Sequence, residues 1–235
     1  TLASVENVII NAGGSVNVTA TESANINAAD SSKVSANNQA YGGVISVNMV
    51  LSQADAYISN ATITTPGDVV VDAQNASILE VTSTTKSKAN NAVGVVVSLN
   101  TVGYDSRNIL FEAIDALLGI DVFDSDNSSS TAYIENTSVQ AGGAVSVVSH
   151  NEATLNATTG NEQVSNSNNH FAVMAKAGKS GMSAGGMLAI NKVSADAIAY
   201  ILNSQVDAGG PVMVDAQDNS GMDANSTLIA STVTE

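Results

Sequence analysis

One block of about sixteen residues occurs four times without gaps, and this repeat constrains the fold more than any other feature of the 235-residue chain. The blocks begin near residues 5, 58, 134 and 201 and read VENVIINAGGSVNVTA, ISNATITTPGDVVVDA, IENTSVQAGGAVSVVS and ILNSQVDAGGPVMVDA. Internal repeats of this kind are typical of solenoids, in which each unit buries its apolar residues against the next unit. We therefore expect residues 1–235 to form a single array of stacked repeats.

The residue types recur column by column within the blocks. Apolar and polar residues alternate after the glycine, as in Val145, Ser146 and Val147, which is the period of a strand with one buried face. Asparagine tolerates left-handed backbone and glycine supplies positive φ, so we predict that both columns are structural corners between strands rather than ligand-binding positions. The corner residues are Asn7, Asn60, Asn136, Asn203, Gly14, Gly67, Gly143 and Gly210.

A second string precedes three of the blocks and contains Asn48, Asn100 and Asn191 in one register. Equivalent asparagines of the first two blocks, Asn7 and Asn60, are 53 residues apart, whereas the glycines Gly14 and Gly42 are 28 apart. The shorter spacing suggests that each repeat is two coils, which gives seven to nine coils in all. The expected fold is all-β, a parallel β-helix (β-solenoid) of stacked coils.

Two stretches lengthen the basic repeat. Residues 105–120, DSRNILFEAIDALLGI, carry apolar residues at helical spacing, and they predict one short amphipathic helical insertion. We expect its apolar face to pack on the flank of its own solenoid, with docking on another chain as the alternative. Residues 150–184 predict a second insertion, a polar surface loop followed by the strand FAVMAKAG.

The charge of the chain limits its partners. It has 22 acidic residues against 7 Lys and Arg, a formal net charge of −15, which repels nucleic acid and anionic membrane surfaces. No apolar run approaches eighteen residues, so we predict no membrane insertion. Aromatic residues make up only 3% of the chain, which predicts a thin core of small and β-branched side chains.

The sequence predicts no enzyme, no catalytic residues and no cofactor. The string GMSAG around Ser183 matches a nucleophile elbow, but that arrangement needs a later histidine, and both His150 and His170 precede the serine. Clustered acids with Lys or Arg on one face, as a carbohydrate-cleaving β-helix requires, are not visible.

Two groups of residues are candidate binding sites. Tyr57, Tyr133 and Tyr200 share one column, and we expect an exposed aromatic stripe that stacks on sugars or proteins. The alternative is that each ring only covers the flanking alanines. A weak calcium candidate is an acidic loop with the carboxylates Asp121, Asp124 and Asp126, although an EF-hand glycine is missing there.

Two strings, AYIENTSVQAGGAVSVVS and AINKVSADAIAYILNSQVDAGGPVMVDAQ, resemble the repeat of giant bacterial surface adhesins. These are the filamentous-haemagglutinin-like and leukotoxin-type β-helical repeat proteins. The resemblance implies an exported, extracellular protein of the bacterial cell surface with a structural role in cell adhesion. It also implies neighbouring repeats of the same parent chain as partners, together with cell-surface glycans, proteins or further copies of itself. Two alternatives remain open: a carbohydrate-active β-helix, and a self-assembling extracellular fibre subunit.

Overall fold

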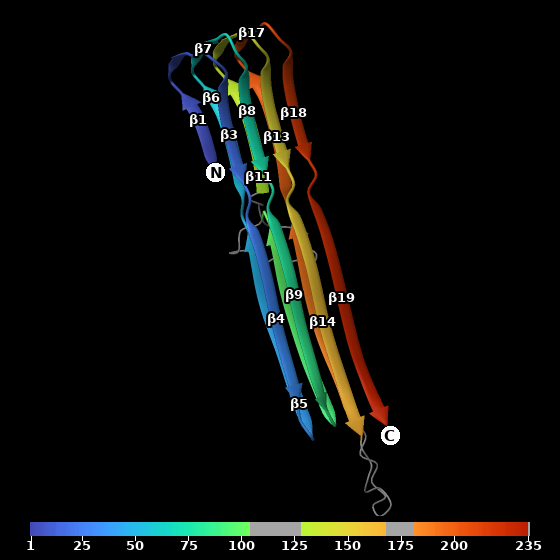
Figure 1. Ribbon diagram of the computed structural model, residues 1–235. Coiled ribbons are helices and arrows are strands. Elements are labelled where there is room, and N and C mark those ends of the chain that lie inside the picture. The colour runs from blue at the N-terminus through green and yellow to red at the C-terminus, as the bar shows by residue number, and fades with distance from the viewer. Residues whose placement is uncertain (104–127, 168–180, 235) are drawn as a thin grey trace, which may run out of the picture.

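A computed structural model describes residues 1–103, 128–167 and 181–234 of the chain (Figure 1). The regular structure of these residues consists of β-strands and contains no helix. Each repeat contributes its strands in the same order, and equivalent strands of successive repeats pair in parallel. The predicted all-β class is confirmed, and the parallel stacking is consistent with a β-solenoid.

The first repeat contains β1 (Leu2–Glu6), β2 (Ile9–Asn11), β3 (Val16–Glu22), β4 (Asn25–Ser35) and β5 (Gln39–Val50). The second contains β6 (Gln53–Ser59), β7 (Thr62–Thr65), β8 (Val69–Asn75), β9 (Ile78–Ala89) and β10 (Asn91–Val102). The third contains β11 (Ser128–Glu135), β12 (Ser138–Ala141), β13 (Val145–Asn151), β14 (Thr154–Ser167) and β15 (Met182–Val193). The fourth contains β16 (Ala195–Leu202), β17 (Gln205–Ala208), β18 (Val212–Asp218) and β19 (Gly221–Thr234).

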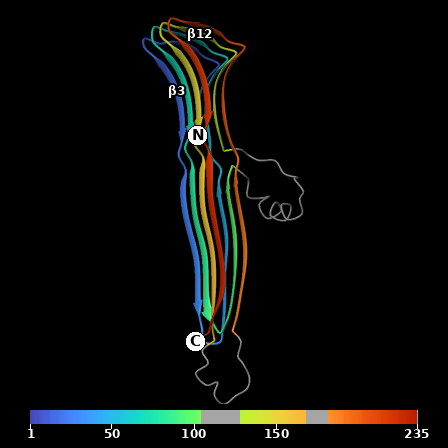
Figure 2. The same ribbon diagram turned by 90° about the vertical axis from the view of Figure 1, so that its right-hand side faces the viewer.

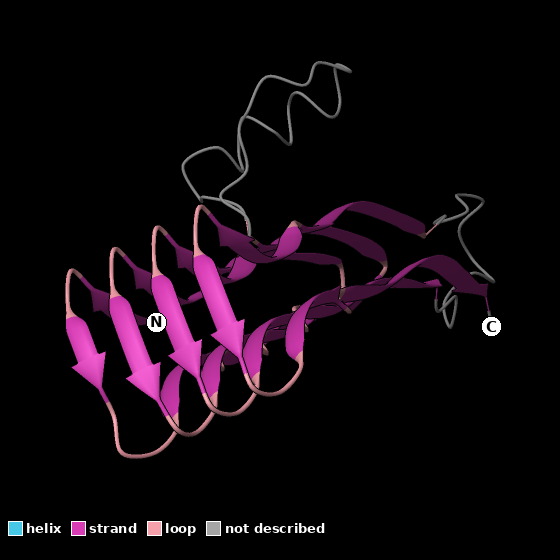
Figure 3. Ribbon diagram, turned by 90° about the horizontal axis from the view of Figure 1, so that it is seen from above, coloured by secondary structure: helices cyan, strands magenta, loops and turns pink. Residues whose placement is uncertain are grey.

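The strands form five parallel sheets, which we name A to E. Their strand orders are β1-β6-β11-β16 for sheet A, β2-β7-β12-β17 for sheet B, β3-β8-β13-β18 for sheet C, β4-β9-β14-β19 for sheet D and β15-β10-β5 for sheet E. Sheets C and D follow one another along one long face, and sheets E and A return along the other (Figures 1 and 2). Sheet A thus faces sheet C and sheet E faces sheet D, while sheet B joins A to C at one end. Viewed from above, the four repeats lie side by side (Figure 3).

The strand register agrees with the alignment of the four blocks. Val5 pairs with Ile58, Ile58 with Ile134, and Ile134 with Ile201. Each repeat therefore contributes one strand to each sheet in turn, and we call this course of the chain one passage. The described residues make four passages, and the fourth has no strand in sheet E. The prediction of two coils per repeat, and of seven to nine coils, is wrong. The spacing of 28 residues separates strands on opposite faces of one flat passage, not strands that pair.

The surface loop predicted in the first part of the 150–184 insertion is wrong, and residues 168–180 of that insertion lie outside the described residues. Thr154 to Ser165 in β14 pair residue by residue with Ile78 to Ala89 in β9, so this stretch is a regular part of the repeat. Its polar residues are not a surface loop, because alternate ones point into the space between sheets D and E. The predicted strand FAVMAKAG and the predicted helix at 105–120 lie outside the described residues.

Two thin apolar clusters make up the core. The larger lies between sheets A, B and C and consists of Ala, Val and Ile side chains such as Ile58, Ile63 and Val145, which are fully buried. The smaller lies where sheet D begins and sheet E ends, around Leu79 and Leu155. The larger cluster consists of the small and β-branched residues that the composition predicted, whereas the smaller one also contains the two leucines.

Corner residues achieve their bends in two different ways. Asn7, Asn60, Asn136 and Asn203 have φ angles of 52°, 50°, 50° and 48°, in the left-handed region. The glycine column does not have positive φ, so that part of the prediction is wrong. Close packing between repeats explains the glycine at position 67, because a Cβ atom there would lie 2.6 Å from the Ser15 backbone nitrogen of the neighbouring repeat.

The space between sheets D and E is narrow and polar. Ser46 and Ser98, neighbours in sheet E, lie 2.6 Å and 3.3 Å, measured between hydroxyl oxygens, from Ser83 of sheet D. These buried hydroxyls bond to one another, which satisfies polar groups that are costly to bury alone. Short side chains allow the two sheets to come close together.

Candidate functional site: a tyrosine ladder on sheet A

The tyrosine column belongs to β6, β11 and β16, whose sequences QADAYIS, SSSTAYIE and ADAIAYIL alternate small or apolar residues with larger ones. In β6, the residues on either side of Tyr57, Ala56 and Ile58, are fully buried. Successive side chains of a strand point to opposite faces, so the tyrosine lies on the outer face of sheet A. In-register pairing then places Tyr133 beside Tyr57, and Tyr200 beside Tyr133.

The three rings stack face to face along the axis of the repeats. The centroids of Tyr57 and Tyr133 are 4.6 Å apart with an interplanar angle of 6°, and those of Tyr133 and Tyr200 are 4.9 Å apart with an angle of 5°. These separations match the usual spacing of paired strands, so the parallel register itself sets the ring spacing. We call these three residues the tyrosine ladder.

Acidic neighbours and the rings themselves determine the ionisation of the ladder. The Tyr57 hydroxyl donates a hydrogen bond to the Glu6 carboxylate, and this bond is the main reason that the pKa of Tyr57 is raised. Burial, followed by the two flanking tyrosines, raises the pKa of Tyr133 to about 12. Burial, and then the charge of Glu135, raises the pKa of Tyr200. All three side chains are therefore neutral phenols at neutral pH.

The stacking changes what the ladder offers to a ligand. Tyr133 has a tyrosine on each face, so a sugar ring does not reach a free face of Tyr133 without displacing Tyr57 or Tyr200. The hydroxyls and ring edges remain on the partly exposed outer surface. The rings contact one another rather than only the flanking alanines, which differs from the alternative reading of the column. Ligand binding by the ladder stays a prediction.

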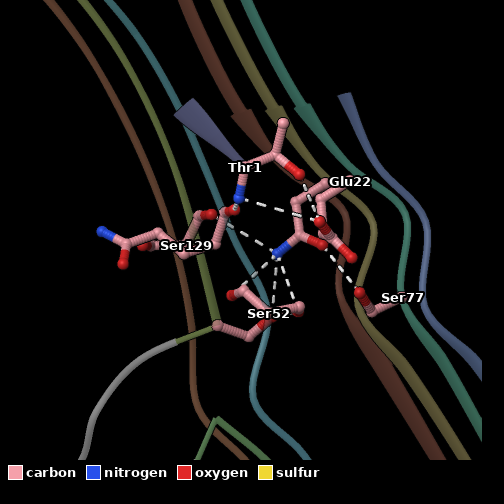
Figure 4. Close-up of polar contacts among 8 residues, drawn as sticks. Thr1, Glu22, Ser52, Ser77 and Ser129 are labelled. Atoms are coloured by element: carbon pink, nitrogen blue, oxygen red, sulfur yellow. Dashed lines mark hydrogen bonds and ion pairs between the residues drawn. The ribbon is translucent and has the colours of Figure 1, made fainter. Parts of the chain in front are cut away.

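Buried polar contacts join sheets A and C around Ser52 and Ser77 (Figure 4). We call this group of contacts the polar partition. The Asn75 side-chain amide donates to the hydroxyl oxygens of Ser52 and Ser128, at 3.1 Å and 2.9 Å, and its oxygen accepts from Ser77 at 2.8 Å. In the next repeat, Asn151 takes the same position and donates to the Ser128 carbonyl at 2.6 Å. These contacts join sheet C to sheet A, so the partition is structural.

Side-chain amides of asparagines form a ladder along the inner face of sheet E. The Asn48 amide donates to the Asn100 side-chain oxygen at 2.9 Å, and Asn100 donates to that of Asn191 at 2.8 Å. The shared register of these three residues is confirmed. Asparagine stacking thus occurs here along the inner face of sheet E.

The serine of the GMSAG string and a pair of aspartates in equivalent repeat positions, Asp72 and Asp215, lie on different sheets. Ser183 lies inside strand β15 and its hydroxyl donates to the Ser231 carbonyl at 2.5 Å, so it is not on a strand-to-helix turn. Asp72 and Asp215 share a column, separated by one strand. Asp215 lies 3.7 Å from the His150 ring nitrogen.

In residues 1–103, 128–167 and 181–234, no group of three or more His, Cys, Asp or Glu is placed to hold a metal ion. The calcium candidates Asp121, Asp124 and Asp126 lie outside these ranges. None of the described segments is a helix of the length and apolarity needed to cross a bilayer.

Comparisons with known proteins identify no relative. No family model, no curated protein and no solved structure matches this chain. The likeness to giant adhesins consequently rests on the repeat strings alone.

Sequence reasoning missed two features of the surface. One is Glu6, which bonds to Tyr57 across the first pair of strands and follows from the register once that is known. The other is the outer face of sheet E, which exposes apolar residues such as Ile45, Val95 and Leu188. The strands of sheet E contain no Asp or Glu in a chain with 22 of them. This gap in the charge pattern is the sequence feature that could have predicted an apolar outer face on sheet E.

Proposed function

We propose that this chain is a structural, adhesive repeat segment of an exported bacterial surface adhesin or surface fibre. It would act as a β-solenoid rod that holds binding regions away from the cell. The activity is mechanical and requires no catalysis. Stacked strands with a continuous backbone ladder supply stiffness along the rod, and the net charge of −15 keeps rods apart.

One observation carries the proposal: equivalent strands of all four repeats pair in parallel and in register, so the repeats share one cross-section. Val5, Ile58, Ile134 and Ile201 lie beside one another in sheet A. In the same way, Val16, Val69, Val145 and Val212 lie beside one another in sheet C. Repeats that stack in register extend along one axis, which suits a rod.

The native mass and location of the protein test the proposal. An antibody raised against this chain is used to blot fractionated source cells, with surface protease treatment of intact cells as the control for exposure. A surface-exposed band many times heavier than 23.7 kDa supports a long adhesin or fibre array. A soluble secreted band near 23.7 kDa contradicts it, and a carbohydrate-active β-helix then becomes the first reading.

A second candidate is a self-assembling extracellular fibre, in which copies of the chain stack end to end. The observation that favours it is that the first and the last described repeats expose inward-facing residues, for example Ile26 and Met222, which share a column with the buried Leu79. Sedimentation of the purified chain over a range of concentrations distinguishes the two. Growth of polymers with concentration supports the fibre, and a persistent monomer supports repeats joined in one longer chain.

A further inference from the structure

The tyrosine ladder places oxidisable rings in direct contact between successive repeats. Ring centroids 4.6 Å and 4.9 Å apart, with nearly parallel planes, bring the ring carbons next to each hydroxyl into neighbouring positions. Holding two reacting groups in this way converts an encounter in solution into a step within one molecule. We propose that Tyr133 is a site of oxidative cross-linking, which forms a dityrosine bond with Tyr57 or Tyr200 when the protein meets a one-electron oxidant.

The oxidant class is a peroxidase with hydrogen peroxide, and the reaction balances as follows. Each of two phenols loses one electron and one proton, and the peroxide accepts both electrons and both protons to give two molecules of water. The two phenoxyl radicals then couple through one new carbon–carbon bond between ring positions next to the hydroxyls. The hydrogens on those carbons move to the phenoxyl oxygens, which restores both aromatic rings with a net loss of two hydrogen atoms.

Neighbouring groups favour the first step at Tyr57. Its hydroxyl already donates a hydrogen bond to the Glu6 carboxylate, which is placed to accept the phenolic proton as the electron leaves. The pKa of Tyr133 is raised to about 12, so Tyr133 enters the reaction as a neutral phenol. Its ring contact with Tyr57 supplies the path by which oxidation reaches it.

The bond would tie the repeats together covalently. Tyr57 and Tyr133 belong to β6 and β11, so their coupling closes a loop between residues 76 positions apart in sequence. A cross-link of this kind stabilises a fold mainly by restricting the unfolded chain. The chain has no cysteine, and therefore no disulfide of its own that could serve this purpose. This inference does not depend on the proposed adhesin function.

Tyr41 provides a control within the same protein. It is 66% exposed in β5, more accessible to an oxidant than any ladder tyrosine, and has no stacked ring partner within the described residues. If exposure alone governed coupling, Tyr41 would dominate and would link separate molecules. If ring contact governs it, the ladder reacts first and within one chain.

The test is dilute oxidation of the whole chain with peroxidase and hydrogen peroxide. Dityrosine is read by its fluorescence, intrachain bonds by a monomeric band on a denaturing gel, and the linked residues by mass spectrometry of digested peptides. We expect monomers that lack two hydrogen atoms and a linked peptide pair that contains Tyr133. Tyr133→Phe keeps the ring but removes the phenol and is expected to reduce intrachain coupling to background, whereas Tyr41→Phe leaves it unchanged.

Two results would overturn the inference. One is a wild-type chain that forms only bonds between molecules through Tyr41 or Tyr104. The other is a Tyr133→Phe variant with undiminished intrachain coupling. Circular dichroism of each variant before oxidation shows that the fold is retained, and Tyr200→Phe, which leaves the Tyr57–Tyr133 pair intact, is expected to retain coupling between those two residues.

Discussion

Single residues set the direction of the chain at each corner. Asn60 follows β6 directly, and Asn136 follows β11 in the same way, each with φ near 50°. Left-handed backbone costs most L-residues about 1–2 kcal/mol because Cβ approaches the following carbonyl oxygen, and asparagine tolerates it better. The asparagine column therefore lets sheet A turn into sheet B in every repeat.

Asn136→Ala is expected to lower the free energy of unfolding by about 1 kcal/mol, because alanine resists the left-handed conformation. Asn136→Gly is the matched control, since glycine adopts positive φ without strain, and a smaller loss is expected. Urea denaturation followed by circular dichroism measures both. Equal losses in the two variants would show that side-chain contacts, not φ, give the position its importance.

At the scale of elements, the closeness of sheets D and E depends on glycines that face across the gap. Gly94 in β10 lies against the Gln163 side chain of β14, and a Cβ there would lie 2.5 Å from the Gln163 amide carbon and 2.8 Å from the Thr85 methyl. Gln163 is fully buried, so it has no open space to move into. The glycine thus makes room for a long polar side chain between two sheets.

Gly94→Ala is expected to destabilise the fold by about 1–3 kcal/mol, the usual cost of overpacking. Gly43→Ala is the control on the neighbouring strand, because the nearest atom to its Cβ is the Val95 oxygen at an ordinary 3.6 Å. Thermal melting compares the two variants. Combining Gly94→Ala with Gln163→Ser should recover part of the loss, and no recovery would mean that the clash is elsewhere.

Stability at high pH is expected to depend on the tyrosine ladder. Because the folded state raises the pKa of Tyr133 from 10.0 to about 12, it favours the neutral phenol. That contribution is complete below pH 10 and is lost as the pH rises through about 12. Urea titrations across this window should show a steeper loss for the wild type than for Tyr133→Phe. Parallel curves for the two proteins would contradict the raised pKa.

At the scale of the whole molecule, each repeat covers the inward-facing apolar residues of the repeat next to it. A residue in one column is therefore protected in the middle of the array and unprotected at the end, as Val145 and Val212 show. The stability of such an array is approximately a sum of repeat and interface contributions. Position along the rod then decides how much a given substitution costs.

Val145→Asp is expected to cost about 3–5 kcal/mol, because it leaves an unpaired charge between two repeats. Val212→Asp, in the same column at the exposed end, is expected to cost less than about 1 kcal/mol. Denaturant unfolding of both variants makes the comparison. In a longer chain with a further repeat next to β18, Val212→Asp should become as costly as Val145→Asp, and an unchanged cost would argue against an extended rod.

The sequence by itself determined which residues lie beside each other along the axis. In-register parallel stacking places equivalent residues of successive repeats beside one another. The alignment of the repeats alone therefore predicts the columns of Asn, Gly, Val and Tyr. Alternation within each block likewise determined which side chains of a strand face inward, such as Ile58, and which face outward, such as Tyr57.

Only the tertiary structure decided how one passage of the chain closes on itself. Spacing in sequence does not distinguish two strands that pair from two strands that face each other across a core. For this reason the spacing of 28 residues between Gly14 and Gly42 wrongly predicted a complete coil. The face-to-face contact of Tyr57 with Tyr133 and the fit of Gln163 against Gly94 were equally hidden. These contacts join residues 76 and 69 positions apart in sequence. Strand pairing and packing together set such distances, and local sequence preferences do not.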